Sequence, residues 1–299
     1  AGAKVYVYGG NFTKSGSSSN SNILYLRNST EIVVGKVGEA GPTMTYTGGK
    51  HMLKLGGKVE KGSITFNSGT FTHEGSSGYV FDLDQGSDVP ITINGGTWEI
   101  KGHDSSVIRV NDGGINGGTF IQNSDGEPVI LKNNGQLTVT GGTFKHSGSC
   151  AIIQTGSNHN NGALIIDGTA NADAIVINHT GTGSFIQYRA QSGMEIKNVN
   201  LTIMGEGSIL DVTSNATNDI KISGSNLTSS NHTINIADVD KTDSSSVTTI
   251  TSSTISSYVS KAISNPKNWT VNIDASTIKD NALGNHVHTP VWTYDEQYH

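Results

Sequence analysis

The sequence predicts an all-β protein, a right-handed parallel β-helix in which each repeat of the sequence forms one turn of a solenoid. The first observation is a motif, I-N-G-G-T-W at 93–98, which recurs as I-N-G-G-T-F at 115–120 and as V-T-G-G-T-F at 139–144. The second is a composition with 38 Gly among 299 residues and abundant Ser, Thr and Asn. The third is that only 15% of the residues are charged, against about 25% in an ordinary globular domain.

A frame of two apolar residues, separated by four small or polar residues, extends this motif along the chain. Its copies are Val7/Phe12, Phe66/Phe71, Ile93/Trp98, Ile115/Phe120, Val139/Phe144, Ile165/Ala170, Ile196/Leu201, Ile222/Leu227, Ile250/Ile255 and Ile273/Ile278. A degenerate copy, Ile32/Val37, fills the gap after Phe12. Successive second members lie 22 to 34 residues apart, which is the period of a solenoid with one turn for each repeat. We therefore expect about eleven rungs and, at one strand spacing per rung, a rod of roughly 50 Å.

Inside the frame, paired glycines allow a sharp bend, so that both apolar residues turn inward. The residue before the second apolar member is Thr or Asn in these copies: Asn11, Thr70, Thr97, Thr119, Thr143, Thr169, Asn200, Asn226, Thr254 and Thr277. Equivalent residues of stacked strands lie about 4.8 Å apart. This column is therefore expected to form a hydrogen-bonded ladder.

Two further strands complete each predicted turn. A second apolar run follows most frames: Ile23-Leu24, Val80-Phe81, Val107-Ile108, Val129-Ile130, Ile152-Ile153, Ile209-Leu210, and Ile234 with Ile236. A third short strand leads into the frame, as at 90–93. The strands of each turn are expected to face a common interior.

The repeat predicts one elongated domain over residues 1–283, with two departures from regularity. Residues 38–65 are expected to be an insertion, and residues 178–192 to hold an extra apolar element that lengthens one turn. Residues 284–299 lie beyond the last frame and are predicted to form a C-terminal cap or linker tail, because a solenoid end otherwise exposes its core and its strand edges. The chain begins within a rung, so we expect the sequence to be part of a longer protein.

Composition argues against several functions. The formal net charge is −6, and nucleic-acid binding would require a basic face. No apolar run approaches the length of a membrane span. The single cysteine, Cys150, rules out an intramolecular disulfide and is expected to be a small core residue. Only His286 and His288 are closely spaced, without a third ligand, so we expect no metal and no other cofactor.

Candidate binding residues follow the second apolar run of each turn. Asp82 and Arg109 are expected to face outward on adjacent rungs, about 5 Å apart. Asp84, Asn111 and Asn133 are expected to form the next outward column. Polar columns of this kind suit hydrogen bonding to sugars. Asp82 and Asp84 beside Arg109 could also be a carboxylate pair for glycoside hydrolysis, and the structural alternative is a surface ion pair beside an asparagine ladder.

A second candidate site lies in the expected insertion. It contains four lysines, Lys50, Lys54, Lys58 and Lys61, in a protein that is acidic as a whole. Such a cluster could attract an anionic polymer such as a glycosaminoglycan, in an interaction that salt would weaken. The alternative is an ordinary solvated loop, or an irregular rung whose lysines point outward.

The G-G-T-[FW] rungs and the Ser/Thr/Asn/Gly background resemble the passenger regions of bacterial autotransporters of the pectin-lyase-like β-helix class. This resemblance implies secretion, display at the bacterial cell surface and outer membrane, and a role in virulence through adhesion. The implied partners are host extracellular glycans or matrix proteins, with self-association as a further route to cell aggregation. It also implies a membrane-anchoring barrel elsewhere in the full-length protein.

Two classes of function therefore remain. The first is a non-catalytic surface adhesin. The second is a polysaccharide-degrading enzyme, a lyase or glycoside hydrolase, or a phage tailspike fragment, because these share the architecture. A polygalacturonase-like enzyme would show paired aspartates with G-H-G and R-I-K motifs, whereas the nearest match is G-H-D at 102–104 and R-I-K does not occur. The adhesin is therefore the favoured prediction.

Overall fold

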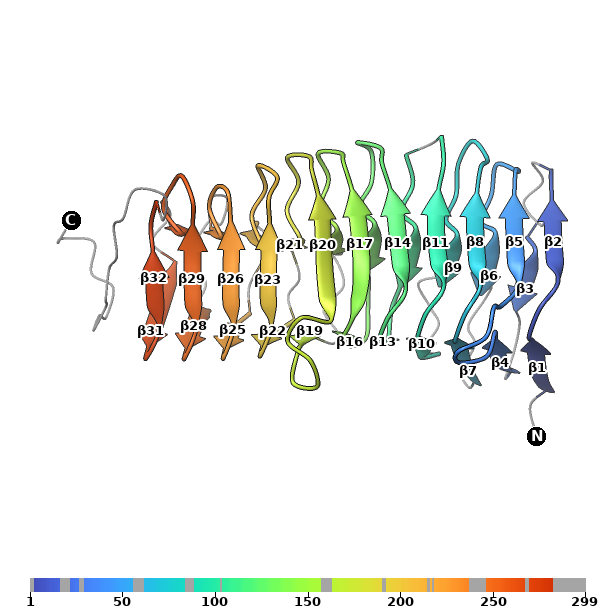
Figure 1. Ribbon diagram of the computed structural model, residues 1–299, viewed down its shortest axis with the longest axis horizontal. Coiled ribbons are helices and arrows are strands. Elements are labelled where there is room, and N and C mark those ends of the chain that lie inside the picture. Colours follow the sequence, from blue (N-terminus) through green and yellow to red (C-terminus); the bar gives the residue numbers. More distant parts are fainter. Residues whose placement is uncertain are drawn as a thin grey trace.

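The protein is a parallel β-solenoid, shown by a computed structural model in which the rungs stack side by side along one axis (Figure 1). The structure describes residues 3–16, 22–26, 30–55, 62–83, 89–102, 104–156, 163–189, 192–213, 216, 218–236, 246–266 and 269–281. All regular elements in these residues are β-strands. This confirms the predicted fold class.

Four parallel sheets run along the rod. Sheet A contains β1 (Ala3–Val7), β4 (Thr30–Val34), β7 (Gly62–Phe66), β10 (Ile91–Ile93), β13 (Gly113–Ile115), β16 (Leu137–Val139), β19 (Leu164–Asp167), β22 (Met194–Lys197), β25 (Ile220–Ser223), β28 (Val247–Thr251) and β31 (Thr270–Asp274). Sheet C contains β3 (Leu24–Leu26), β6 (Leu53–Leu55), β9 (Phe81–Leu83), β12 (Ile108–Val110), β15 (Ile130–Lys132), β18 (Ile153–Thr155), β21 (Ile186–Tyr188), β24 (Leu210–Val212), β27 (Ile234–Asn235) and β30 (Ile263–Ser264).

The third side of the rod is divided between two sheets. Sheet B contains β2 (Asn11–Lys14), β5 (Thr43–Tyr46), β8 (Thr70–His73), β11 (Thr97–Ile100), β14 (Thr119–Gln122), β17 (Gly142–His146) and β20 (Ile175–His179). Sheet D contains β23 (Asn200–Ile203), β26 (Asn226–Ser229), β29 (Thr254–Ser257) and β32 (Thr277–Lys279). The described residues make about nine turns. This is slightly fewer than the eleven rungs that the frame predicted, although sheet A contains eleven strands.

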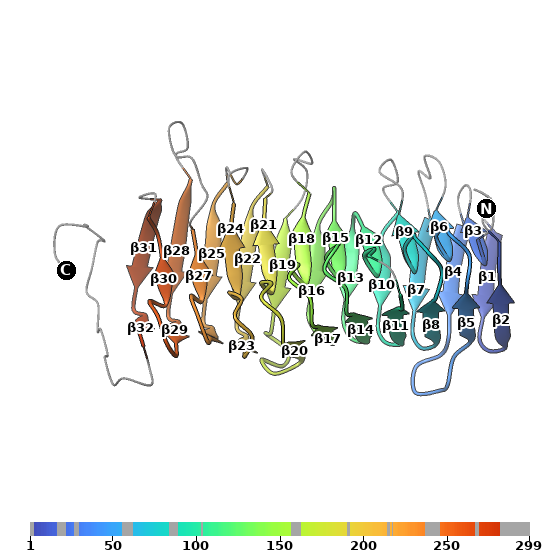
Figure 2. The same ribbon diagram turned by 90° about the horizontal axis from the view of Figure 1, so that it is seen from above.

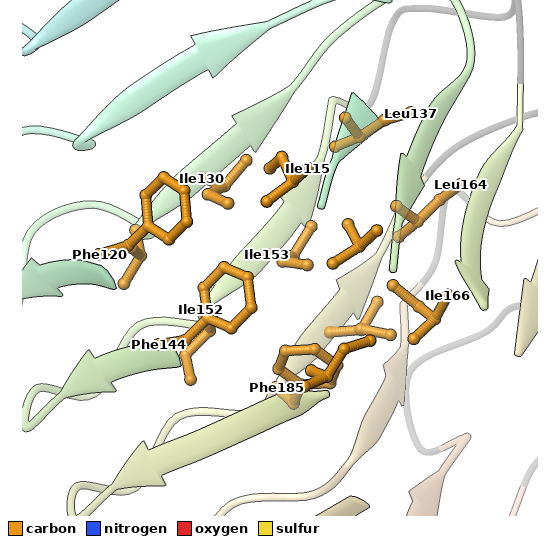
Figure 3. Close-up of a cluster of buried hydrophobic side chains, with 14 of the residues drawn as sticks. Ile115, Phe120, Ile130, Leu137, Phe144, Ile152, Ile153, Leu164, Ile166 and Phe185 are labelled. Carbon is orange, nitrogen blue, oxygen red and sulfur yellow. The ribbon is translucent and has the colours of Figure 1, made fainter. Parts of the chain in front are cut away.

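Apolar side chains from three sides meet in a continuous core (Figure 3). The first frame residues stack in register through sheet A, as Phe66, Ile93 and Ile115 do. The second frame residues stack through sheet B, where Trp98 pairs with Phe120 in the strand register. Most of the predicted frame is therefore confirmed, because alternation along short strands points these residues to one interior.

Two predicted frame copies are wrong, and both fall where a turn is long. Val37 is 78% exposed, and the inward pair of that rung is Val34 with Met44. Figure 2 shows the loop between β4 and β5, over residues 35–42, projecting from the rod.

The other wrong copy is Ile165/Ala170. Its place in the register is taken by Ile166 and Ile177, because residues 168–174 form a longer loop between β19 and β20 (Figure 1). The same loop separates sheets B and D, since the Asn200 N–H donates to the Ala172 carbonyl at 2.9 Å.

Beyond the projecting loop, the described residues of the predicted insertion and of the extra element belong to regular strands or the turns that join them. Residues 38–65 contain β5 and β6, which pair in register with β8 and β9. Residues 178–192 contain β21, an ordinary strand of sheet C, preceded by the buried Phe185. Cys150 was expected in the core but is only half-buried, and its Sγ donates to the Asp125 carbonyl at 2.7 Å. Residues 284–299 lie outside the described residues.

Asparagines form a ladder one position beyond the first frame residue. Asn94 Nδ2 donates to Asn67 Oδ1 at 2.8 Å, and Asn116 Nδ2 donates to Asn94 Oδ1 at 2.9 Å. The Thr/Asn column that was predicted keeps its register in sheet B, where Thr70, Thr97 and Thr119 are paired. In sheet D its side chains are also bonded, because Asn226 Nδ2 donates to Asn200 Oδ1 at 2.8 Å.

Buried histidine side chains accept hydrogen bonds from the turns that connect sheets B and C. The Gly75 N–H donates to His73 Nδ1 at 3.1 Å, and the Gly181 N–H donates to His179 Nδ1 at 3.0 Å. Because Nδ1 is the hydrogen-bond acceptor in each case, the other ring nitrogen, Nε2, carries the hydrogen of the neutral imidazole. Burial lowers the pKa of both histidines. Gln122 lies in the same strand register as His179, with His146 between them. Its side-chain oxygen accepts a hydrogen bond from the Ser124 N–H at 2.7 Å.

Candidate functional site

The outward-facing side chains of sheet C form one column along the rod. In register, from the N-terminal end, they are Tyr25, Lys54, Asp82, Arg109, Leu131, Gln154, Gln187, Asp211, Asn235 and Ser264. Neighbouring members belong to adjacent rungs, so the column offers one side chain about every 4.8 Å. It confirms that Asp82 and Arg109 lie side by side.

Asp82 is the centre of an ion cluster. Its side chain is 0% exposed, whereas those of Arg109 and Lys54 are 19% and 26% exposed. Arg109 Nε donates to Asp82 Oδ1 at 2.5 Å. Asp82 Oδ2 lies 3.8 Å from Lys54 Nζ and 3.3 Å from His51 Nε2. Three cationic or titratable groups from neighbouring rungs therefore cover one carboxylate.

Aromatic rings pack against this cluster. His51 stacks on Tyr79 with ring centroids 5.1 Å apart, and the Arg109 guanidinium carbon lies 5.0 Å from the centre of the Tyr79 ring. Burial lowers the pKa of His51 to about 4, although the Asp82 charge opposes this shift. The imidazole is therefore neutral at pH 7. Among the described side chains that contact Asp82, two cations, Lys54 and Arg109, then face one carboxylate.

Asn111 and Asn133 do not form an outward column, and that prediction is wrong. They are 3% and 4% exposed. Strands β12 and β15 end at Val110 and Lys132, so the inward and outward alternation of a strand no longer applies to the residues that follow. Asp84 lies outside the described residues.

Lys132, just before this turn, is also fully buried. Its Nζ donates to the Asn133 carbonyl at 3.2 Å, and burial lowers its pKa to about 8. A lysine that points inward is unusual in an apolar core, because a buried charge needs polar partners. The turn that follows β15 supplies one such partner, the Asn133 carbonyl.

The predicted lysine cluster is only partly described. Lys50 is exposed in the turn after β5, and Lys54 lies in β6 within the Asp82 cluster. Lys58 and Lys61 lie outside the described residues. Lys54 is therefore part of a regular sheet C strand, because β6 pairs with both β3 and β9.

A groove of about 420 Å³ continues the sheet C column toward the C-terminal end. Gln154, Gln187 and Asp211 line it from the column, and Glu127 and Arg189 line it from the turns. Burial raises the pKa of Glu127, against the opposing charge of Arg189. The sequence prediction missed Gln154, Gln187 and Asp211. They occupy the same position in the sheet C strands as Asp82 and Arg109, so the same register could have identified them.

A second hollow of about 520 Å³ lies over β19, β22 and β25 of sheet A. Its lining includes Ile165, Glu195, Asp219 and Lys221. Glu195 already lies 3.4 Å from Lys197 Nζ. The sheet C groove is the stronger candidate, because it continues a column of polar and charged side chains.

Comparison of the chain with known protein families, curated proteins and solved structures finds no match. In the part of the chain that the structure describes, no helix is long and apolar enough to cross a membrane. The described residues also contain no group of three or more His, Cys, Asp or Glu side chains that could hold a metal ion.

Proposed function

We propose that the protein is a non-catalytic adhesin that binds an extended glycan along the sheet C column. The observation that supports this best is the alignment of Gln154, Gln187 and Asp211 with the groove that they line. Side-chain amides donate and accept hydrogen bonds, as sugar hydroxyls do. A column with one side chain about every 4.8 Å suits a linear ligand that lies along the rod.

The biological setting of this proposal comes from the autotransporter resemblance. A passenger of the pectin-lyase-like β-helix class would be secreted and displayed on the bacterial cell surface. The partners would be host extracellular glycans or matrix proteins. Self-association would be a further activity of the same rod. The parallel β-solenoid supports the architecture that this resemblance requires.

Replacement of both Gln154 and Gln187 by Ala tests the proposal. We expect weaker binding on a glycan array, with little change in melting temperature, because both side chains face outward from sheet C. Gln136→Ala removes an exposed amide outside the groove lining and is the matched control. Equal binding by the double variant and the control would remove the groove from consideration.

A polysaccharide-degrading enzyme is the second candidate. The observation that favours it is Glu127, a groove-lining carboxyl group whose pKa is raised by burial, as a general acid requires. Incubation with neutral and acidic polysaccharides, followed by size analysis, separates the two functions. Depolymerisation that is lost in Glu127→Gln would support the enzyme. Binding without any change in polymer length would support the adhesin.

A further inference from the structure

We infer that Lys54 and Arg109 form a subsite for an anionic group of the glycan, a carboxylate or a sulfate, and that Asp82 positions them. This inference rests on the proposed function, because it assigns one sugar-binding position within the same column. It adds the class of glycan, an acidic polysaccharide. It also states where the acidic sugar binds, at the N-terminal end of the sheet C column.

The first argument is the balance of charge in the cluster. Asp82 supplies one negative charge, and its two oxygens face Arg109 and Lys54. Among the described side chains that contact Asp82, the neutral state of His51 leaves two cations, Lys54 and Arg109, for one carboxylate, within a chain of net charge −6. Burial raises the pKa of Tyr79 in this cluster, and Glu127 lies close enough that its charge adds to the shift. The positive charge of Arg189 in turn opposes the rise that burial causes in the pKa of Glu127.

The second argument is the difference between the two ion pairs. Arg109 Nε makes a hydrogen bond to Asp82 at 2.5 Å, so this pair is tight. Lys54 Nζ lies 3.8 Å from the same carboxylate, which is beyond hydrogen-bond distance. An ammonium group carries three donors. The Lys54 head group is therefore held near Asp82 by charge and can still donate hydrogen bonds to a ligand.

The third argument is partial burial. Asp82 is fully covered, and the covering cations keep part of their surface at the outer face of sheet C. Charges in such a position are less screened by salt than fully exposed charges. Contact of Arg109 with Tyr79 restricts the guanidinium plane. An anion that approaches the column therefore meets cations that are already oriented.

The fourth argument is the neighbour of Lys54 in the column. Tyr25 pairs with Lys54 in the β3–β6 register and is exposed. A tyrosine ring offers an apolar face with a polar tip, which suits the C–H face of a sugar ring next to its charged substituent. Tyr25 and Lys54 together would then contact one acidic sugar unit.

The column also changes character along the rod. It is cationic at Lys54 and Arg109, uncharged at Gln154 and Gln187, and anionic at Asp211. A polymer with an acidic group on every unit would be repelled at Asp211. A glycan with alternating acidic and neutral units is the better fit, with an acidic unit at the Lys54 end.

The test measures the affinity of the full 299-residue chain for hyaluronan oligosaccharides and for the same oligosaccharides after carboxyl reduction. The wild-type protein should bind the acidic form about fivefold more tightly, and added salt should reduce the difference. Lys54→Gln should lose this preference, whereas Lys54→Arg should keep it. Lys145→Gln, which removes an exposed lysine from sheet B, is the control for net charge.

Three results would overturn the inference, and they separate it from the proposed function. Equal wild-type affinity for both oligosaccharides would refute the anionic subsite and leave glycan binding intact. An unchanged preference of Lys54→Gln for the acidic oligosaccharide would show that a cation other than Lys54 binds the carboxylate. Absence of binding to either oligosaccharide and to sulfated heparin would refute both proposals. Binding to heparin that is lost in Lys54→Gln, without binding to hyaluronan, would support a sulfate as the ligand group.

Discussion

Trp98 stacks on Phe71 of the preceding rung, with ring centroids 4.2 Å apart and planes inclined by 28°. The stack continues from Trp98 to Phe120 at 6.2 Å and from Phe120 to Phe144 at 5.2 Å. Phe185, which directly precedes β21 of sheet C, then packs against Phe144 at 6.0 Å. A continuous stack of aromatic rings therefore crosses successive rungs. Truncation of one ring in this stack should affect the packing of the rings on both sides of it.

Replacement of Phe120 by Ala should lower the free energy of unfolding by about 3–5 kcal/mol, because it truncates a fully buried aromatic side chain. Chemical denaturation measures this loss. Val176→Ala, at an exposed apolar position of sheet B, is the control and should cost less than about 1 kcal/mol. A loss of similar size in both variants would mean that Phe120 does not support the core.

Asp82→Asn should destabilise the protein by about 2 kcal/mol, because it leaves the Arg109 and Lys54 charges without their carboxylate. Removal of one partner of a fully buried pair costs about 3–5 kcal/mol, and the partial exposure of both cations reduces this cost. A thermodynamic cycle with Asp82→Leu and Arg109→Leu checks the coupling. Strictly additive losses would show that the two side chains do not stabilise each other.

Stability should fall as the pH is lowered from about 6.5 toward 4. The pKa of His51 is lowered to about 4, so between these values the unfolded chain binds a proton that the folded chain does not. The pKa values of His73 and His179 are shifted in the same direction by burial. Stability from these neutral groups is therefore present above their unfolded pKa and is lost below it.

The variant His179→Gln tests the contribution of one turn to this acid sensitivity. Glutamine at the equivalent position of β14, Gln122, makes the corresponding hydrogen bonds without titrating in this range. Urea denaturation at several pH values should show a shallower loss of stability below pH 6, by up to about 1.4 kcal/mol per pH unit. An unchanged slope would exclude His179 as a source of the acid sensitivity.

Gly113→Ala should destabilise the rung that begins with β13, by about 1–3 kcal/mol or more. Gly113 has φ +140°, and a Cβ atom at this position would overlap the carbonyl oxygen of Ile91. Gly114→Ala is the matched control, because its nearest neighbour would be Asn116 Oδ1 at 3.6 Å, an ordinary contact. Thermal melts of the two variants should differ clearly, and equal melting temperatures would contradict the close approach of the two strands.

The candidate site was only partly predictable. Asp82 and Arg109 could be placed together because both follow the buried residue of the second strand, and β9 and β12 share that register. Asn111 and Asn133 were misplaced because the strands end before them. The contributions of His51 and Tyr79 to the Asp82 cluster depend on the shapes of turns, which have no period in the sequence.

The sequence by itself determined the solenoid, since the apolar frame must face one interior and its period sets one turn of chain. The tertiary structure decided where the turns lengthen, as at residues 35–42 and 168–174. Outward loops can lengthen because each doubling of loop length costs only about 0.6 kcal/mol of closure free energy, so core packing does not constrain their length. It also decided that Asp82 is buried, because its covering side chains come from the two neighbouring rungs, His51 and Lys54 from one and Arg109 from the other.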